Sequence, residues 1–561
     1  MQNKILAVYA TMTALLGMSF AWTAMGAAPD RDPVVTIADG QVRGQVVGDV
    51  MSFKGVPFAA PPVGPLRWRE PKSVQPWSGV RDAIEFGPPC AQAALGWNDT
   101  VAAQSREDCL YLNVWAPVRH GGEALPVMVF FPGGAYHGGS AQGLSSIEPS
   151  YDGAKLAKRG VIVVTANYRL GMFGFLAHPE LTAESPHHAS GNYALMDNLA
   201  ALNWVKANIA RFGGDPRNVT AFGQSAGSFS VGFLLTSPLA KGLFAKAISQ
   251  SGTALDYKLG EPDLQAAETA GAKFAQRLGA PAKGAIAALR RRPAQELFKL
   301  VMADPSLHGA EPRGPVVDHY VFPEQPALVF QAGREAAIPL MVGSTARDGD
   351  LDSMGVSGTP KADATLADRT RPLAESHRVA PLTTKDAKQI QTFYAPYPDL
   401  ARQAMKFYGG KSAADPIDGD VITAFNTDVD FRCGADAIAQ WHARIAPTWQ
   451  YEFSHGYEPL GGVHLWDMLY LFGWLQPPAD QPRDARLVDQ MQRYWVAFAQ
   501  SGDPNAPGLA IWPKSGAKEA YLDFASQGAV ARTGLRTTAC DLFARKTQRD
   551  LAALSAGRSA H

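Results

Sequence analysis

The chain has 561 residues, of which 46% are hydrophobic and 19% are charged, and its formal net charge is zero. This is an ordinary globular composition with enough apolar residues for a large core. A neutral chain without repeats, low-complexity tracts or long runs of like charge gives no electrostatic reason to expect nucleic acid or an anionic membrane as a partner.

Residues 1–26 are predicted to be a signal peptide. Lys4 supplies a short positive start, the apolar stretch 5–20 follows, and Ala24 and Gly26 stand at the −3 and −1 positions of a cleavage site. The alternative is a single membrane anchor, but threonines interrupt the apolar stretch and it is barely long enough to span a bilayer. We therefore expect a secreted or periplasmic protein with no membrane anchor after cleavage.

The chain contains four cysteines, Cys90, Cys109, Cys433 and Cys540. An even number in an exported chain predicts disulfides, and four cysteines allow three pairings. A bond between Cys90 and Cys109 would close a short loop, and one between Cys433 and Cys540 would tie the C-terminal tail to the body. No C-x-x-C or H-E-x-x-H spacing occurs, so no metal site is predicted.

A buried strand is predicted over 125–131, where "LPVMVFF" runs into the glycine-rich loop 132–135. Small residues in such a loop allow backbone N–H groups to point at a bound carbonyl oxygen, as in the oxyanion loop of α/β-hydrolases. The alternative is a plain glycine-rich turn. Its place after a strand, about ninety residues before the serine motif described next, favours the oxyanion loop.

The segment 199–227 predicts a helix, a strand and then a sharp turn that carries a serine. Apolar residues recur at helical spacing over 199–212, and the strand "NVTAFG" leads directly into the G-x-S-x-G pattern of Gly223, Ser225 and Gly227. The pattern alone also fits a flexible Gly/Ser loop. A buried helix is predicted after it, and this strand–turn–helix context indicates a nucleophile elbow.

A serine nucleophile needs donors for the oxyanion that forms when it attacks a carbonyl carbon. We predict that the N–H groups of Gly134, Ala135 and Ala226 form this oxyanion hole.

Several long motifs resemble the type-B carboxylesterase family, which includes cholinesterases and carboxylesterase-like lipases. The resemblance implies an α/β-hydrolase fold: a central, mostly parallel, twisted sheet flanked by helices, with helical insertions over the active site, in one large domain over 27–561. The motifs that carry it are "GQVRGQVVGDVMSFKGVPFAAPPVGPLRWREP", "WSGVRDAIEFGPPC", "REDCLYLNVWAP", "VIVVTANYRLGMFGFL", the serine segment, "IPLMVGSTARDGD" and "GVHLWDMLYLFG".

The resemblance also implies a catalytic triad. His464 in "GVHLWDMLYLFG" matches the family's catalytic histidine, and Asp348 in "GSTARDGD" takes the place that glutamate usually holds. Asp350 is the alternative acid in that segment. The order Ser225, Asp348, His464 is that of nucleophile, acid and base in α/β-hydrolases.

The same resemblance pairs Cys90 with Cys109 and, less closely, Cys433 with Cys540. It also makes Arg67 and Glu107 a structural ion pair behind the first disulfide loop, without a part in the chemistry.

Two departures from the family concern the substrate. Gln224 stands where many relatives have glutamate before the serine, which argues against choline esters. In "SGTALDYKLG", Tyr257 and Lys258 replace the tryptophan that often walls the acyl pocket. Lys258 either makes the pocket suitable for an acyl group with a free carboxylate or pairs with Asp256 or Glu261 at the surface.

The leading interpretation is a secreted serine carboxylesterase that acts on small-molecule esters through an acyl-enzyme and needs no cofactor or metal. One alternative is an esterase for anionic polycarboxylic acyl groups, as in fumonisin-like toxins. A non-catalytic adhesion protein of the same fold is a further alternative, but all three triad roles are filled. A lipase with a lid is disfavoured because the 90–109 loop is polar. The oligomeric state and the natural ester are not predicted.

Overall fold

The computed structural model describes most of the chain after the predicted signal peptide. The described residues are 32–118, 122–143, 151–255, 260–350, 382–410, 415, 417–456, 462–473, 482–516 and 519–557. The predicted signal peptide lies outside them.

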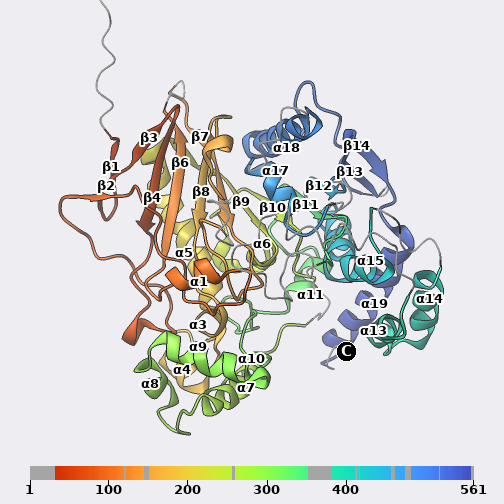
Figure 1. Cartoon of the computed structure of the whole chain (residues 1–561), viewed down its shortest axis with the longest axis horizontal. Coiled ribbons are helices and arrows are strands. Elements are labelled where there is room, and N and C mark those ends of the chain that lie inside the picture. The colour runs from red at the N-terminus through yellow and green to blue at the C-terminus, as the bar shows by residue number, and fades with distance from the viewer. Residues whose placement is uncertain are drawn as a thin grey trace, which may run out of the picture.

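Eleven strands of the described residues form one sheet, in the order β14-β13-β12-β11-β10-β9-β7-β8-β6-β4-β3 (Figure 1). Strands from β13 to β8 in this order run parallel to their neighbours, and the strands at both ends pair antiparallel. In sheet order the strands are Gly528–Thr533, Ala520–Ala525, Thr448–Phe453, Leu340–Thr345, Lys246–Gln250, Gly214–Gln224, Leu125–Phe131, Ile162–Ala166, Tyr111–Pro117, Val50–Pro57 and Gln45–Val47. A separate three-stranded sheet contains β1 (Val34–Ile37), β2 (Gly40–Arg43) and β5 (Val80–Asp82).

Strand β7 shows why both faces of the sheet are covered. Val127, Val129 and Phe131 belong to one apolar core, whereas Met128 and Phe130 belong to another. Successive side chains of a strand point to opposite faces, so the continuous apolar run "VMVFF" supplies a core on each side.

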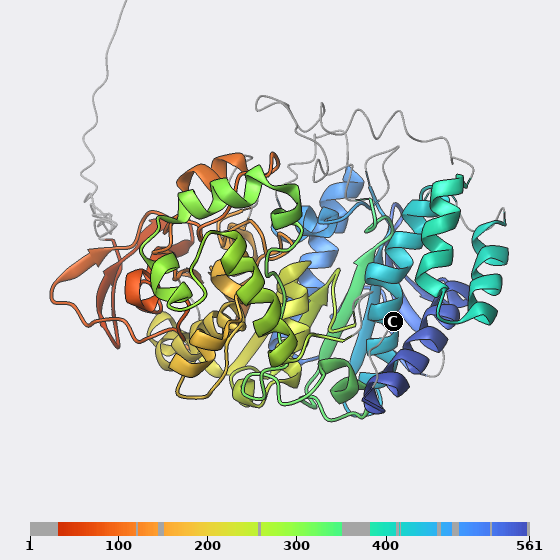
Figure 2. The ribbon, with the colours of Figure 1, turned by 90° about the horizontal axis from the view of Figure 1, so that it is seen from below.

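Helices cover these two faces (Figures 1 and 2). The first core receives side chains from α5 (Tyr193–Asn208), α6 (Ala226–Thr236) and α16 (Cys433–His442). The second core receives side chains from α2 (Ala154–Ala157), α17 (Trp466–Leu471) and α18 (Pro482–Ser501). The expected mostly parallel sheet flanked by helices is confirmed.

Two further groups of helices lie beside the sheet and the helices that cover it (Figure 1). One group contains α4 (Pro179–Glu184), α7 (Leu264–Arg277), α8 (Ala285–Arg290), α9 (Ala294–Ala303) and α10 (Pro305–His308). The other contains α13 (Thr384–Tyr394), α14 (Pro398–Tyr408), α15 (Val421–Thr427) and α19 (Thr537–Ser555). The remaining helices of the described residues are α1 (Asp99–Gln104), α3 (Gly171–Phe175) and α11 (Pro326–Gln331), with short 3₁₀ turns at Gly64–Leu66, Ile209–Phe212 and Pro238–Ala240 and a π-helical turn at Asp428–Arg432. None of the helices in the described ranges has the length and apolar composition needed to cross a bilayer.

The helix predicted over 199–212 is observed, but it begins earlier. Helix α5 starts at Tyr193, and a 3₁₀ turn continues it to Phe212, where Gly213 ends it with a left-handed φ of 87°. The first turns of α5 are buried on every side, including Asp197 and Asn198. Such a helix shows no polar face, so apolar periodicity does not reveal its start.

The structure joins Cys90 to Cys109 and Cys433 to Cys540, which is the pairing that the family resemblance implies. Cys433 opens α16 and Cys540 lies in α19, so the second bond ties the last helix to the helix beside β11 and β12. Both cysteines lie in a third apolar cluster, formed with α13, α14 and α15.

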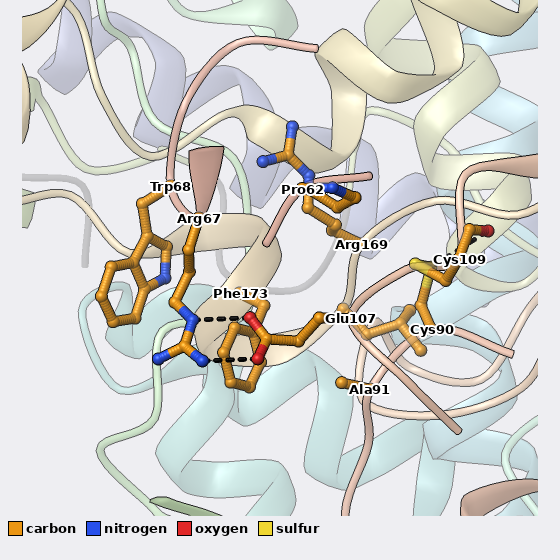
Figure 3. A pocket seen from close by; sticks show the side chains of 10 residues that line it. Pro62, Arg67, Trp68, Cys90, Ala91, Glu107, Cys109, Arg169 and Phe173 are labelled. Carbon is orange, nitrogen blue, oxygen red and sulfur yellow. Dashed lines mark hydrogen bonds and ion pairs between the residues drawn. A yellow bond between two sulfur atoms is a disulfide. The ribbon is translucent and has the colours of Figure 1, made fainter. Parts of the chain in front are cut away.

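Behind the first disulfide lies the predicted structural ion pair (Figure 3). The guanidinium of Arg67 faces the carboxylate of Glu107 with both of its edge nitrogens, and the Nε–Oε2 distance is 2.5 Å. The third nitrogen of Arg67 donates to the carbonyls of Leu289 and Arg292, both at 2.8 Å. The pair therefore fixes the disulfide loop to the end of α8, as expected of an architectural contact.

Removal of the Cys433–Cys540 bond should destabilise the protein more than removal of the Cys90–Cys109 bond. The two bonds close loops with sequence separations of 107 and 19 residues, and chain entropy predicts losses of about 4–5 and about 3 kcal/mol, respectively. Urea unfolding of the two double Cys→Ser variants measures the difference. An equal or reversed order would contradict the chain-entropy account.

Candidate active site

Ser225 occupies a strained turn between β9 and α6. Strand β9 ends at Gln224 and α6 begins at Ala226, so Ser225 alone makes the turn, with φ 54° and ψ −125°. A non-glycine residue in this region costs on the order of 1–3 kcal/mol. The N–H of Ser225 donates to the carbonyl of Gln250 at 2.9 Å, which holds the turn against β10.

The two glycines of the motif are required by close backbone approach. A Cβ at Gly223 would lie 2.4 Å from the carbonyl carbon of Gly227, and a Cβ at Gly227 would lie 1.9 Å from the carbonyl oxygen of Phe131. Both distances are far below van der Waals contact. The start of α6 therefore packs directly on the end of β7.

The loop after β7 lies against Ser225. A Cβ built at Gly133 would be 2.9 Å from the Cβ of Ser225. The loop turns back at once, because His137 and Gly138 both donate N–H groups to the carbonyl of Gly134, at 2.9 and 3.0 Å. Ala135 and Tyr136 have left-handed φ angles of 53° and 60°.

The predicted oxyanion donors share one property. Among the described residues, none accepts a hydrogen bond from the N–H groups of Gly134, Ala135 or Ala226. Ala226 is also the first residue of α6, and N–H groups in a helix's first turn have no partner within the helix. These three N–H groups are thus free to bind a carbonyl oxygen.

Asp348 and His464 are in contact. The Nδ1 of His464 lies 2.8 Å from Oδ1 of Asp348, which is fully buried. Thr345, the last residue of β11, holds the same carboxylate with its N–H at 2.8 Å and its hydroxyl at 2.7 Å. Asp350 instead pairs with Arg347 at 3.3 Å, so the structure brings Asp348 and not Asp350 to the histidine.

The loop that carries Asp348 is also joined by backbone hydrogen bonds to the segment that leads to His464. Arg347 donates its N–H to the carbonyl of Gly462 at 2.8 Å, two residues before His464, and Ala346 donates to Phe453 at 3.0 Å. The distance between the carboxylate and the imidazole is therefore set by backbone contacts as well as by the side chains.

Gln224 contacts the other nitrogen of the histidine. The Nε2 atoms of Gln224 and His464 are 3.2 Å apart. With Asp348 accepting at Nδ1–H, the neutral ring has its lone pair at Nε2 and accepts from the Gln224 amide. Ser225 Oγ makes no hydrogen bond within the described chain, and contacts of this kind often form only when substrate binds.

Arg432 holds the loop that carries Asp348, and it was not predicted from the sequence. It donates to the carbonyl of Ala346 at 2.7 Å and pairs with Asp418, Asp428 and Glu452, each at 2.7 Å. The guanidinium is fully buried. Burial raises the pKa of Glu452 to about 7, even though Arg432 favours the charged form.

Asp467 is a second buried carboxyl close to the histidine, and it was also missed. It lies in the first turn of α17, and its Oδ2 accepts from the side chains of Gln250 and Tyr451, both at 2.9 Å. Burial raises its pKa to about 6, and the hydrogen bonds from Gln250 and Tyr451 counteract that rise. An acid three residues after the histidine is visible in the sequence, but its burial is not.

Tyr257 and Lys258, predicted to line the acyl pocket, lie outside the described residues, and so does Asp256. The described residues contain no group of three or more His, Cys, Asp or Glu side chains that could hold a metal ion.

Several known esterases are similar to this chain in sequence and structure. The model of the carboxylesterase family matches residues 31–543. The fumonisin B1 esterase of Sphingopyxis macrogoltabida is 35% identical over 540 residues, which cover 91% of each chain. The para-nitrobenzyl esterase of Bacillus subtilis (strain 168) is 35% identical over 500 residues, 86% of this chain and 92% of the relative.

A solved PNB esterase structure has a TM-score of 0.73 with 32% sequence identity, and the match covers 91% of this chain and all of that one. The predicted ester hydrolase activity and α/β-hydrolase fold are confirmed, and these relatives give the adhesion alternative no support. The chain therefore is a carboxylic ester hydrolase and belongs to the carboxylesterase family.

Proposed function

We propose that the chain hydrolyses esters through an acyl-enzyme on Ser225, with His464 as the base and Asp348 as the residue that orients it. The contact of 2.8 Å between Asp348 and His464 carries this proposal. The strained backbone of Ser225 and its position next to Gln224, whose amide reaches the same imidazole, support it.

In the first step, His464 Nε2 takes the proton of Ser225 Oγ while the oxygen attacks the ester carbonyl carbon. The Gln224 amide N–H must then leave Nε2, because that nitrogen becomes a donor. The oxyanion receives the N–H groups of Gly134, Ala135 and Ala226, assisted by the N-terminus of α6.

In the second step, the protonated His464 gives its proton to the departing alcohol, and the acyl group stays on Ser225. Water then attacks the acyl-enzyme with His464 again as the base, which releases the acid and restores the serine. Asp348 stabilises the charged imidazole in both steps. None of these steps requires a metal or an organic cofactor.

Aspartate can fill the place of the family's glutamate because the loop is held close to the histidine. Thr345 fixes the Asp348 carboxylate from one side, and Arg432 holds the preceding carbonyl of Ala346. These contacts compensate for the missing methylene of the shorter side chain.

We further propose that residues 1–26 are removed during export and that residues 27–561 form one domain. Two disulfides suit an oxidising compartment such as the periplasm or the extracellular space. Mass spectrometry of the protein after expression with its native leader tests the cleavage.

A narrower function is also supported by a specific observation. The Sphingopyxis relative is a fumonisin B1 esterase, and we propose esters with anionic polycarboxylic acyl groups as a candidate substrate class. Gln224 supports it, because a neutral amide beside the nucleophile does not repel an anionic substrate as a glutamate would.

Ser225→Ala should lower kcat on a simple aryl ester by several orders of magnitude, because no other group can form the acyl-enzyme. An organophosphate should label Ser225 and no other residue in peptide maps. Ser237→Ala is the matched control, since Ser237 is a buried serine at the other end of the same helix. Near-normal hydrolysis by Ser225→Ala would contradict the proposed mechanism.

Asp348→Asn should lower kcat by roughly 10⁴-fold, the loss measured for the same change in another serine hydrolase, because an amide favours the wrong imidazole tautomer. Asp350→Asn should stay within a few-fold of the parent, since Asp350 contacts Arg347 rather than His464. Steady-state kinetics of both variants make the comparison. The reverse result would move the acid to position 350.

A further inference from the structure

The loop that carries the predicted oxyanion donors also carries a histidine placed between two opposite charges. The Nδ1 of His137 lies 3.4 Å from Oε2 of Glu311, and its Nε2 lies 2.7 Å from Nη1 of Arg313. A guanidinium can only donate, so Nε2 must hold the lone pair and Nδ1 must carry the proton. The three side chains therefore form a line of contacts from Arg313 through His137 to Glu311, of which the first is a hydrogen bond and the second is a longer polar contact.

The acid of this chain is buried, whereas its cation is exposed. The Glu311 side chain is 4% exposed, the His137 side chain is 11% exposed, and Arg313 is an exposed residue. The other oxygen of Glu311 accepts from the N–H of Met172 at 3.1 Å. Glu311 thus fixes the histidine from inside, and a molecule that arrives from solvent meets Arg313 first.

The guanidinium of Arg313 has N–H groups that its contact with His137 does not use. Its contact with His137 uses one of five N–H groups, and no carboxylate in the described part of the chain pairs with it. An exposed guanidinium held at one edge and open elsewhere is well suited to a two-point contact with a carboxylate.

The histidine that holds this cation lies on the loop that carries the predicted oxyanion donors. His137 follows Ala135 by two residues, and its N–H is bonded to the carbonyl of Gly134. Since consecutive Cα atoms are about 3.8 Å apart, His137 lies within about 8 Å of Ala135 along the backbone. Gly133 of the same loop lies against Ser225.

We propose that Arg313, held by His137, binds a free carboxylate of the substrate, so that the enzyme favours esters that carry a carboxylate besides the scissile ester group. This inference rests on the proposed function and names its substrate class. Arg313 determines specificity and takes no part in bond cleavage. The carboxylate can belong to the acyl or the alcohol part, and the test separates the two.

The test uses matched pairs of esters that differ only in charge. The acyl pair is the mono-4-nitrophenyl ester of glutaric acid and the same ester with its free carboxylate converted to the carboxamide. The alcohol pair is 4-acetoxybenzoate and 4-acetoxybenzamide. The variants are Arg313→Gln, Arg313→Lys and the control Arg217→Gln, whose side chain is 91% exposed and pairs, within the described residues, with Asp215 alone.

Arg313→Gln should lower kcat/KM for the anionic ester of one pair by roughly 10- to 100-fold, the range expected for a lost charged hydrogen bond. Its neutral partner should change less than about threefold. Arg313→Lys should keep part of the preference, and Arg217→Gln should keep all of it. High salt should weaken the preference of the parent but not of Arg313→Gln. The pair that responds identifies the acyl or the alcohol side.

Equal losses on the anionic and neutral esters, or no loss on either, would overturn the proposed subsite. Failure of the proposed mechanism would be seen elsewhere, as retained activity of Ser225→Ala on all four esters. The Kd of glutarate for the Ser225→Ala protein, with and without Arg313→Gln, measures binding at the subsite in the absence of catalysis. A Kd that does not rise in the double variant also counts against it.

Discussion

The close contact between the end of β7 and the start of α6 is the constraint on which the site depends. Gly227 has no room for a Cβ because the carbonyl of Phe131 lies against it, and Gly223 has none because Gly227 does. This contact forces the chain to turn within one residue, which places Ser225 at φ 54°. It also brings the loop that follows Phe131 beside the serine, so that the proposed nucleophile and the proposed oxyanion donors are placed by one packing contact.

The proposed acid, Asp348, is held in place by a different arrangement, a buried charge cluster. The fully buried guanidinium of Arg432 forms ion pairs with Asp418, Asp428 and Glu452. Arg536 also forms ion pairs with Asp418 and Asp428. Such clusters contribute little net stability, but removal of one member leaves a buried charge unpaired, at a cost of about 3–5 kcal/mol. The cluster thus has few alternative arrangements, and the carbonyl of Ala346 bound to it fixes the loop of Asp348.

The sequence predicted those parts of the site that depend on local pattern. The strand, turn and helix around Ser225 follow from residue spacing, and the family resemblance pointed to His464, to Asp348 and to the cysteine pairs. Neither the residue spacing nor the resemblance predicted the role of Arg432, the burial of Asp467 or the contact between Arg313 and His137. The decisive contacts join distant segments, since Arg432 binds a carbonyl 86 residues away and Arg313 lies 176 residues from His137, and no local periodicity encodes them.

Gln224 connects the proposed catalytic histidine with the proposed substrate class. A glutamate at this position could only accept a hydrogen bond, so it would face the lone pair of neutral His464 with a second lone pair and add a negative charge beside the nucleophile. The amide donates to that lone pair instead, and its Oε1 has no partner in the described structure. Asp348 and Asp467 are both fully buried, so neither of these carboxylates is exposed to a substrate that arrives from solvent.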